Sequence, residues 1–350
     1  MNILKNLDGK NSSLKQRIIA LCINDGDYSL ADLSKELDTS IPTTTKLVGE
    51  LVEDGLLMDM GKVGTNGGRR PSIYGLNPSA GYFVGVNIRR KFIGFAVTDF
   101  KGTLVDFHEY IDFKVENSEE SFRQMCRVIN DELRESGIDP AKVLAYGFNL
   151  TGRVNNETGY CFSYFIGEDK PIASVLEDEL GKPAFVENDS RAMTYGEYIC
   201  GTANGEKNML YLNVAWGLGM GMIVDGKLSY GKSGFSGEIG HFPLLNNNQI
   251  CHCGKMGCLE TGASGSAVNR IFLEKTIYSV FSFYKLIKAV NILKRKFEIK
   301  NSFELTAAGL LKLCYAACPC RQNRLTVTHH INVIKAFLIF LTPANIFKVT

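Results

Sequence analysis

The sequence has little net charge, no long apolar run and no hydrophobic leader, and each absence excludes a class of protein. Its 39 lysines and arginines nearly balance 37 aspartates and glutamates, so no overall field indicates a nucleic-acid partner. No apolar stretch is long enough for a membrane-spanning helix. The first ten residues are polar and lack the pattern of a secretory signal. We therefore expect a cytoplasmic protein whose ten cysteines are reduced rather than paired in disulfides.

The last part of the chain has little glycine and few acidic residues. Residues 276–350 hold one of the 35 glycines, Gly309, and eleven basic residues against two acidic ones. The 275 residues before them hold 28 basic and 35 acidic residues, so the composition changes abruptly. The apolar runs in this tail also lack the capping and turn residues that punctuate a packed domain. We expect residues 276–350 to be an atypical basic tail read from a shifted frame, with a lineage-specific domain as the alternative.

Candidate metal ligands are concentrated in residues 237–260, GEIGHFPLLNNNQICHCGKMGCLE. Four of them lie close together in this segment: His241, Cys251, Cys253 and Cys258. This is the ligand number and chemistry of a closed structural zinc site, and the intervening glycines permit the tight turns that such a site needs. Free thiols near a chance histidine are the alternative, but inert cysteines seldom cluster with glycines between them. The segment therefore predicts one bound Zn²⁺.

The same segment resembles the ROK family, which comprises sugar-responsive repressors and sugar kinases on an actin-like, hexokinase-like α/β fold. The resemblance rests on Gly-Glu-Ile-Gly-His followed by CHCGKMGCLE. It implies that the histidine and the three cysteines hold zinc, and that Glu238, His241 and Glu260 face a sugar. Such a role suits their chemistry, because carboxylates and an oriented imidazole can accept and donate hydrogen bonds to vicinal hydroxyls.

A second motif, ENDSRAMTYGE at residues 187–197, resembles the ROK motif whose aspartate is the general base of the kinases. The resemblance makes Asp189 the equivalent of that base and places Asn188 beside it in the sugar site. For an isolated Asn-Asp pair, a turn or a helix N-cap is the alternative. We expect Asn188 and Asp189 to bind the sugar together with the residues of the zinc segment.

Two loops that bind nucleotide phosphates in ROK kinases are altered in this sequence. The resemblance places the kinases' Asp-x-Gly-Gly-Thr loop at Asn87-Ile88-Arg89-Arg90-Lys91. An amide replaces the acidic residue there, and arginines occupy positions where only glycine lets phosphate approach the backbone. Ala215 and Trp216 replace the Gly-Thr that begins the second loop. We therefore expect a protein that is not an enzyme, with phosphate binding by the arginine side chains as the alternative.

The first 80 residues have the pattern of a winged helix-turn-helix. Apolar spacing predicts helices from Ser13, from Ser29 with a capping box, and from near Pro42, followed by strands at 56–60 and 72–76. The candidate DNA contacts lie on the third helix and on the wing: Thr43, Thr44, Thr45, Lys46, Arg69 and Arg70. This region holds nine basic and ten acidic residues, so a protein-docking module is the alternative. GGRRP followed by LNPSAGYFVGV resembles the junction in ROK repressors.

The pattern after residue 80 predicts alternating strands and helices of an α/β domain. The expected elements are strands within 82–106, a helix over 117–137, a strand over 143–149, a helix over 172–180, a strand over 184–186, a helix over 190–200 and two strands within 209–224. The predicted domains are therefore 1–80, 81–275 and the tail 276–350. We expect the resemblance to stop near residue 275, which would leave apolar surface of the second lobe exposed.

These observations predict a sugar-responsive transcriptional repressor with a structural zinc. The expected partners are a DNA operator, a sugar effector and a second copy of the chain, because the two halves of an operator require two recognition helices. The alternatives are an ATP-dependent sugar kinase with an appended winged helix, and a docking or scaffold protein.

Overall fold

The computed structural model describes residues 11–62, 71–163, 170–201, 203 and 205–277. They divide into two compact units. Of these described residues, the first unit holds those up to Gly205 together with Tyr230–Phe235, and the second holds Glu206–Ser229 and residues 236–277. The predicted wing residues Arg69 and Arg70 lie outside the described residues, as does the predicted tail apart from residues 276 and 277. Within the described ranges, no helix combines the length and apolar character that a bilayer span requires.

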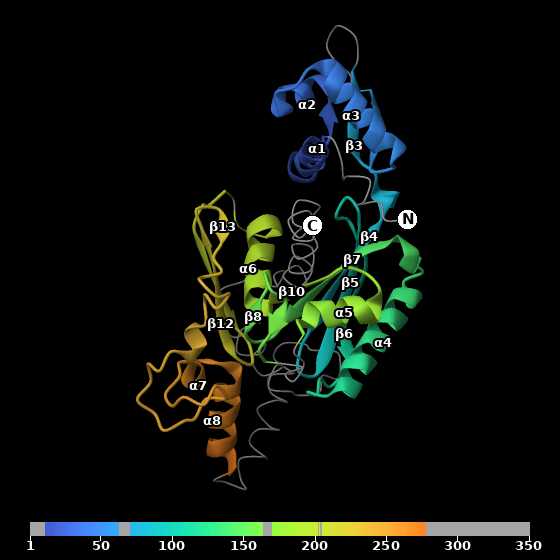
Figure 1. Ribbon diagram of the computed structural model, residues 1–350. Helices are drawn as coiled ribbons and strands as arrows, with labels where there is room; N and C mark the ends of the chain where they lie inside the picture. The colour runs from blue at the N-terminus through green and yellow to red at the C-terminus, as the bar shows by residue number, and fades with distance from the viewer. Residues whose placement is uncertain (1–10, 63–70, 164–169, 202, 204, 278–350) are drawn as a thin grey trace, which may run out of the picture. The chain divides into compact units, whose positions relative to one another are not determined.

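The N-terminal part of the first unit contains three helices and a small antiparallel sheet (Figure 1). Its elements are α1 (Ser12–Asp25), β1 (Tyr28–Ser29), α2 (Leu30–Leu37), α3 (Ile41–Glu53), β2 (Leu57–Lys62) and β3 (Ser72–Leu76). The predicted capping box is confirmed, because the Ser29 hydroxyl accepts the backbone N–H of Asp32 at 3.2 Å. Ser40 caps α3 in the same way through the N–H of Thr43. β1 was not expected, because two residues are too few to show a strand period.

A five-stranded mixed sheet follows in the first unit, in the order β10-β7-β4-β5-β6. Its strands are β4 (Tyr82–Ile88), β5 (Phe92–Asp99), β6 (Leu104–Asp112), β7 (Val143–Leu150) and β10 (Ala184–Asn188). β4, β7 and β10 are parallel, and Asn188 pairs in register with Leu150. The carboxyl ends of β7 and β10 therefore meet at one edge of the sheet, the place where α/β folds position ligand groups.

Helices cover this sheet and connect its strands. The remaining elements of the first unit are η2 (Pro78–Ala80), α4 (Glu119–Glu135), η3 (Pro140–Lys142), β8 (Val154–Asn155), β9 (Tyr160–Cys161), α5 (Ile172–Leu180) and α6 (Asp189–Cys200). α4 and α5 pack on one face of the sheet, where Met125 and Leu176 join Val86 and Phe148 in one buried apolar cluster. Each predicted helix of this domain is present, and α6 begins directly at the end of β10.

The second unit contains a three-stranded antiparallel sheet followed by the predicted metal segment and two helices. Its elements are β11 (Met209–Val214), β12 (Leu218–Val224), β13 (Lys227–Leu228), η4 (Ile239–His241), α7 (Glu260–Ala263) and α8 (Gly265–Ile277). The glycine-containing loop between β11 and β12 is a tight hairpin, because the Ala215 N–H donates to the Gly217 carbonyl at 3.1 Å. The expected strand, loop and strand over 209–224 are thus confirmed.

Candidate functional site

The segment Gly237–His241 lies directly against strand β12 because two of its residues are glycine. Gly237 has a φ of +88°, and a Cβ there would overlap the carbonyl oxygen of Met220. A Cβ at Gly240 would similarly overlap the carbonyl oxygen of Leu218. The Met220 N–H donates to the Gly237 carbonyl at 3.2 Å. The sequence Gly-Glu-Ile-Gly-His therefore fixes the backbone from which Glu238 and His241 project.

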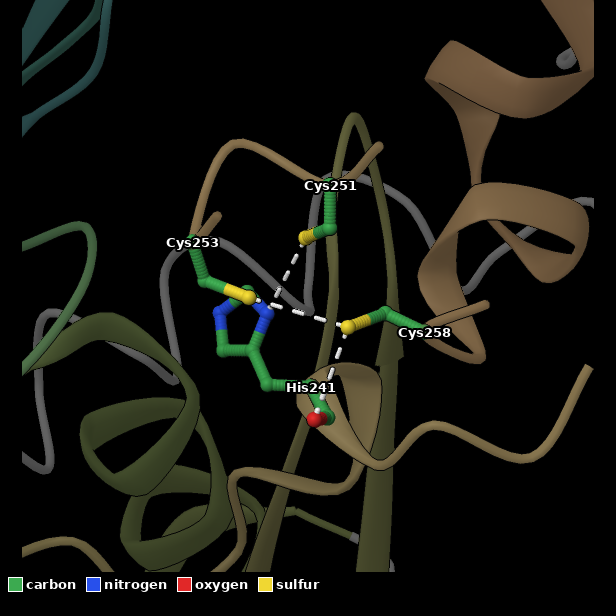
Figure 2. A group of neighbouring side chains, drawn as sticks. All are labelled: His241, Cys251, Cys253 and Cys258. Carbon is green, nitrogen blue, oxygen red and sulfur yellow. Dashed lines mark hydrogen bonds between the residues drawn. The ribbon is translucent and has the colours of Figure 1, made fainter. Parts of the chain in front are cut away.

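The four predicted metal ligands converge (Figure 2), and their ligand atoms all lie within 4.8 Å of one another. The Sγ of Cys251 is 3.4 Å from Nδ1 of His241, and the Sγ atoms of Cys253 and Cys258 are 3.6 Å apart. For sulfur at about 2.3 Å and nitrogen at about 2.0 Å from a tetrahedral Zn²⁺, a sulfur and a nitrogen would be about 3.5 Å apart and two sulfurs about 3.8 Å apart. The spacing and the donor set of three thiols and one imidazole therefore fit a structural zinc ion.

Backbone hydrogen bonds hold the loop that carries the three cysteines. The Cys251 N–H donates to the Lys255 carbonyl at 2.8 Å, and the Gly257 N–H donates to the Gln249 carbonyl at 3.1 Å. Gly257 has a φ of +72°, and a Cβ there would overlap the carbonyl oxygen of Leu245. Cys251 and Cys258 are buried whereas Cys253 is exposed. The glycines thus permit the turns that bring the sulfur atoms together, as the sequence predicted.

Glu260 lies beside this cluster and is nearly buried. Its Oε1 is 2.8 Å from Nδ1 of His252 and accepts a hydrogen bond from the Cys251 thiol at 3.0 Å. Burial alone would raise the pKa of Glu260, but the hydrogen bonds from His252 and Cys251, together with the charges of His252 and His241, outweigh it and lower that pKa to about 2. Glu260 is therefore held as a carboxylate next to the metal ligands.

His252 is a member of this site that sequence reasoning missed. His241, His252 and Glu260 form a second group whose possible ligand atoms lie within 4.8 Å of one another. The only signal in the sequence was its place between two predicted zinc ligands in Cys-His-Cys. His241 itself faces two ways, because Nδ1 is near Cys251 whereas Nε2 is 3.7 Å from a carboxylate oxygen of Glu238. One ring nitrogen is thus available to the metal and the other to a neighbouring polar group.

Asn188 and Asp189 are the predicted sugar-binding residues of the first unit. They lie where the carboxyl ends of β7 and β10 meet. The Thr151 hydroxyl donates to Asp189 Oδ2 at 3.2 Å, and the Asn188 amide donates to Asp189 Oδ1 at 3.2 Å. That amide also donates to the Gly152 carbonyl at 2.7 Å. The Asn188 side chain additionally caps α6, so the N-cap reading of this pair is also correct. Thr151 was not predicted as a partner because only the register of the parallel strands brings it there.

The structure therefore assembles the predicted sugar-binding residues as two groups in separate units. Asn188 and Asp189 belong to the first, and Glu238, His241 and Glu260 belong to the second. Within each unit the side chains present carboxylate, amide and imidazole groups to one another, which is suitable chemistry for binding hydroxyls. Whether both groups bind one ligand stays a prediction.

The two altered loops are tight turns in the structure. In the first, the Arg89 N–H donates to the Phe92 carbonyl at 3.0 Å, and its guanidinium carbon lies 5.9 Å from the centre of the Phe92 ring. Asn87 is buried on β4, one residue before the end of that strand. In the second, the Ala215 carbonyl accepts the N–H of Gly265 at the start of α8. In both loops, backbone groups are therefore hydrogen-bonded to other backbone groups of the protein.

The predicted DNA contacts on α3 do not all face outward. The prediction that Thr44 contacts DNA is wrong. Thr43, Thr45 and Lys46 are exposed, but Thr44 is completely buried. Its hydroxyl lies 2.9 Å from that of Thr39, in the turn between α2 and α3. Successive helical residues are about 100° apart, so a run of three threonines cannot all share one face. Thr44 therefore belongs to the core and cannot contact a base.

A sequence profile of the ROK family matches residues 83–306. The chain therefore belongs to the ROK family. It is 26% identical to a xylose repressor of Caldicellulosiruptor bescii over 339 residues, covering 95% of this chain and 82% of the repressor. It is also 30% identical to a glucokinase of Halalkalibacterium halodurans over 196 residues, covering 55% of this chain and 59% of the glucokinase.

Solved structures confirm the predicted α/β fold of the ROK domain. A ROK family transcriptional regulator, a homolog of the E. coli MLC protein, has a TM-score of 0.61 at 23% identity. The similarity covers 79% of this chain and 69% of that chain. The fold is thus the actin-like, hexokinase-like α/β architecture that the ROK resemblance implied.

The predicted end of the resemblance near residue 275 is wrong. The family profile continues to residue 306, and the repressor alignment covers 95% of the chain. The change in charge and glycine content after residue 275 therefore does not mark the end of family similarity. Whether residues 276–350 come from a shifted reading frame stays a prediction.

Proposed function

We propose that this chain is a sugar-responsive transcriptional repressor. The observation that carries the proposal is the joining of a three-helix, β-hairpin domain to a ROK domain in one chain. A protein named as a xylose repressor is similar to 95% of this chain, including most of that N-terminal domain. A kinase would not need three helices and a hairpin ahead of its catalytic fold, whereas a repressor needs such a module to bind its operator.

The N-terminal domain supports DNA binding through one face of α3. Thr43, Thr45 and Lys46 are exposed on that helix, so their hydroxyl and ammonium groups are accessible to base edges and phosphates. We propose that the chain between β2 and β3 is the wing of a winged helix, with Arg69 and Arg70 as phosphate contacts. A homodimer would place two α3 helices on the two halves of an operator.

The ROK domain supports the binding of zinc and of a sugar. We propose that one Zn²⁺ is held by His241, Cys251, Cys253 and Cys258, and that it fixes the orientation of His241. The proposed sugar-binding residues are Asn188, Asp189, Glu238, His241 and Glu260. Sugar binding changes operator affinity only if the DNA-competent and DNA-incompetent states bind the sugar with different affinities.

An ATP-dependent sugar kinase is the second candidate, favoured by the similarity to a glucokinase. The residues at the first phosphate loop argue against it, because Asn87 replaces an acidic metal ligand and Arg89 and Arg90 replace glycines. Glycine would let phosphate approach backbone N–H groups, and a bulky side chain prevents this approach. We therefore expect sugar binding without phosphoryl transfer.

The decisive experiment is operator selection from random DNA with the full-length chain, followed by binding measurements with D-xylose, D-glucose and other sugars. We expect one sequence to be bound about a thousandfold more tightly than random DNA, and one sugar to weaken that binding at least about tenfold. Replacing Arg69 and Arg70 with alanine should weaken binding to all sequences and reduce its salt dependence. Equal affinity for all DNA sequences, or ATP-dependent turnover of a sugar, would contradict the proposal.

A further inference from the structure

Arg191 is a fully buried arginine whose donors are directed at three separate parts of the first unit. Its Nε and Nη2 each lie 2.7 Å from Oε1 of Glu187, so the two side chains form a buried ion pair. Nη2 donates to the Val154 carbonyl at 2.6 Å, and Nη1 donates to the Gly234 carbonyl. A guanidinium is the side chain that can serve such dispersed acceptors, because its five N–H groups form a rigid fork.

Glu187 and Arg191 flank the Asn188–Asp189 pair in the sequence, and both form hydrogen bonds with Asn188. Glu187 Oε1 also accepts the backbone N–H of Asn188 at 2.7 Å. The Asn188 side-chain oxygen in turn accepts the backbone N–H of Arg191 at 3.0 Å. The residues on either side of Asn188 and Asp189 are therefore fixed by the same network that reaches Gly234.

Gly234 belongs to a short segment, Tyr230–Phe235, which we call the strap. The strap packs as part of the first unit, although the segments before and after it in the sequence belong to the second. The Arg191 guanidinium lies 5.6 Å from the centre of the Tyr230 ring, a cation–π distance. Gly234 has a φ of +75°, and a Cβ there would be 3.1 Å from the Val154 carbonyl oxygen. The strap thus packs directly against β8 and against Arg191.

We propose that Arg191 is a positioning residue for sugar binding, because it anchors this strap beside the Asn188–Asp189 pair. Glu238 follows Gly234 by only four residues, and His241 by seven. Anchoring Gly234 therefore shortens the free chain that leads to the ligand groups of the second unit and limits the positions that they can adopt. The inference rests on the proposed function for its ligand, but the anchoring itself can be measured without any sugar.

Arg191→Lys tests the proposal most directly. A lysine keeps the positive charge opposite Glu187, but one ammonium cannot replace a guanidinium fork that serves Glu187 and both carbonyl groups. Arg153→Lys is the matched control, because Arg153 is exposed and lies 5.9 Å from the centre of the Phe235 ring at the other end of the strap. Gly234→Ala is a second variant that disturbs the strap while leaving Arg191 and Glu187 in place.

Amide hydrogen exchange of the full-length, zinc-loaded chain without sugar is the first measurement. We expect Arg191→Lys and Gly234→Ala to raise exchange over residues 230–241 about tenfold or more, with exchange in β4 and β7 unchanged. The Arg153→Lys control should match the parent. Unchanged exchange over 230–241 would overturn the proposal, and so would an equal rise throughout the first unit, which would indicate a purely structural ion pair.

Calorimetric titration with D-xylose and D-glucose is the second measurement. We expect affinity for the sugar that the parent binds to fall about tenfold in both strap variants and to stay unchanged in the control. Raised exchange with unchanged affinity would overturn the positioning role. If the parent binds neither sugar, the proposed function loses its support, while the exchange result still decides whether Arg191 anchors the strap.

Discussion

Thr44 illustrates how the direction of one side chain on a helix separates a structural role from a functional one. Because it is fully buried and its hydroxyl contacts Thr39, Thr44→Ala should remove a hydrogen bond and a buried methyl group. We expect the free energy of unfolding to fall by about 1–2 kcal/mol, while the preferred operator sequence stays the same. Urea unfolding and operator selection would measure the two effects separately.

Thr45→Ala is the matched comparison, since Thr45 is the next residue and is exposed. Its hydroxyl donates only to the Ile41 carbonyl within the same helix, at 2.8 Å. We expect little loss of stability and an altered operator preference. An altered preference for Thr44→Ala with unchanged stability would contradict the buried position of that residue.

His108 gives the first unit a stability that depends on pH. A hydrogen bond between the His108 ring and the Glu132 carboxylate raises the pKa of the histidine, although partial burial opposes the shift. A raised pKa in the folded state favours folding when the ring is protonated. This contribution is complete below the unfolded value of about 6.5 and is lost as the pH rises through the higher folded value.

Urea unfolding of the parent and of Glu132→Gln at about pH 6 and about pH 8 would test this pair. We expect the parent to be more stable than the variant at the lower pH, with the difference shrinking at the higher pH. The sign follows because the unfolded chain releases its proton first as the pH rises. An equal difference at both pH values would exclude a role for protonated His108.

At the scale of elements, the loop that holds Cys251, Cys253 and Cys258 should depend on its metal. We expect about one Zn²⁺ per chain in the purified protein and well below half an equivalent in Cys253→Ser. Exchange over residues 241–258 should rise with the loss of zinc, because binding of the ion and folding of the loop are coupled. Elemental analysis and hydrogen exchange would measure both effects.

Cys161→Ser is the control for this change, because Cys161 lies on β9 of the first unit, whereas the predicted ligands belong to the second unit. It should retain the zinc content of the parent. Full zinc occupancy in Cys253→Ser would show that this residue is not a ligand.

At the scale of the whole molecule, one face of the sheet in the second unit exposes several large apolar side chains. Leu210, Leu212 and Val214 on β11 are 68%, 57% and 45% exposed. They lie opposite three more apolar residues of β12: Met222, Met220 and Leu218. Contiguous apolar patches of this kind promote association. We expect the purified chain to self-associate through this face.

Replacing Leu210 and Leu212 with lysine should shift the chain toward smaller species in size-exclusion chromatography with light scattering. Lysines on a strand face repel a second copy and raise the cost of burying that face. Val105→Lys is the control, because Val105 is 49% exposed on β6 of the first unit. An unchanged mass distribution in the double variant would exclude this face as the cause of association.

Most elements of this fold could be predicted from the sequence, because each depends on residues close together in the chain. Ser29 and Asp32 fix the start of α2, and runs of mostly apolar, buried residues define β4 and β7. The convergence of the four candidate metal ligands could be predicted for the same reason, since a short segment with glycines at its turns carries them all. The length of β1 and the partners of Asp189 could not, because they depend on strand pairing between distant segments.

The sequence by itself determined the order of helices and strands, the grouping of one histidine and three cysteines in a short segment, and the membership of the ROK family. Each follows from residue type and local spacing. Only the tertiary structure decided that Thr44 faces the core, that His252 contacts Glu260 and that Arg191 reaches the carbonyl of Gly234. The physical reason is that a buried polar side chain must find its hydrogen-bond partners in space, and packing brings those partners from parts of the chain that no local pattern connects.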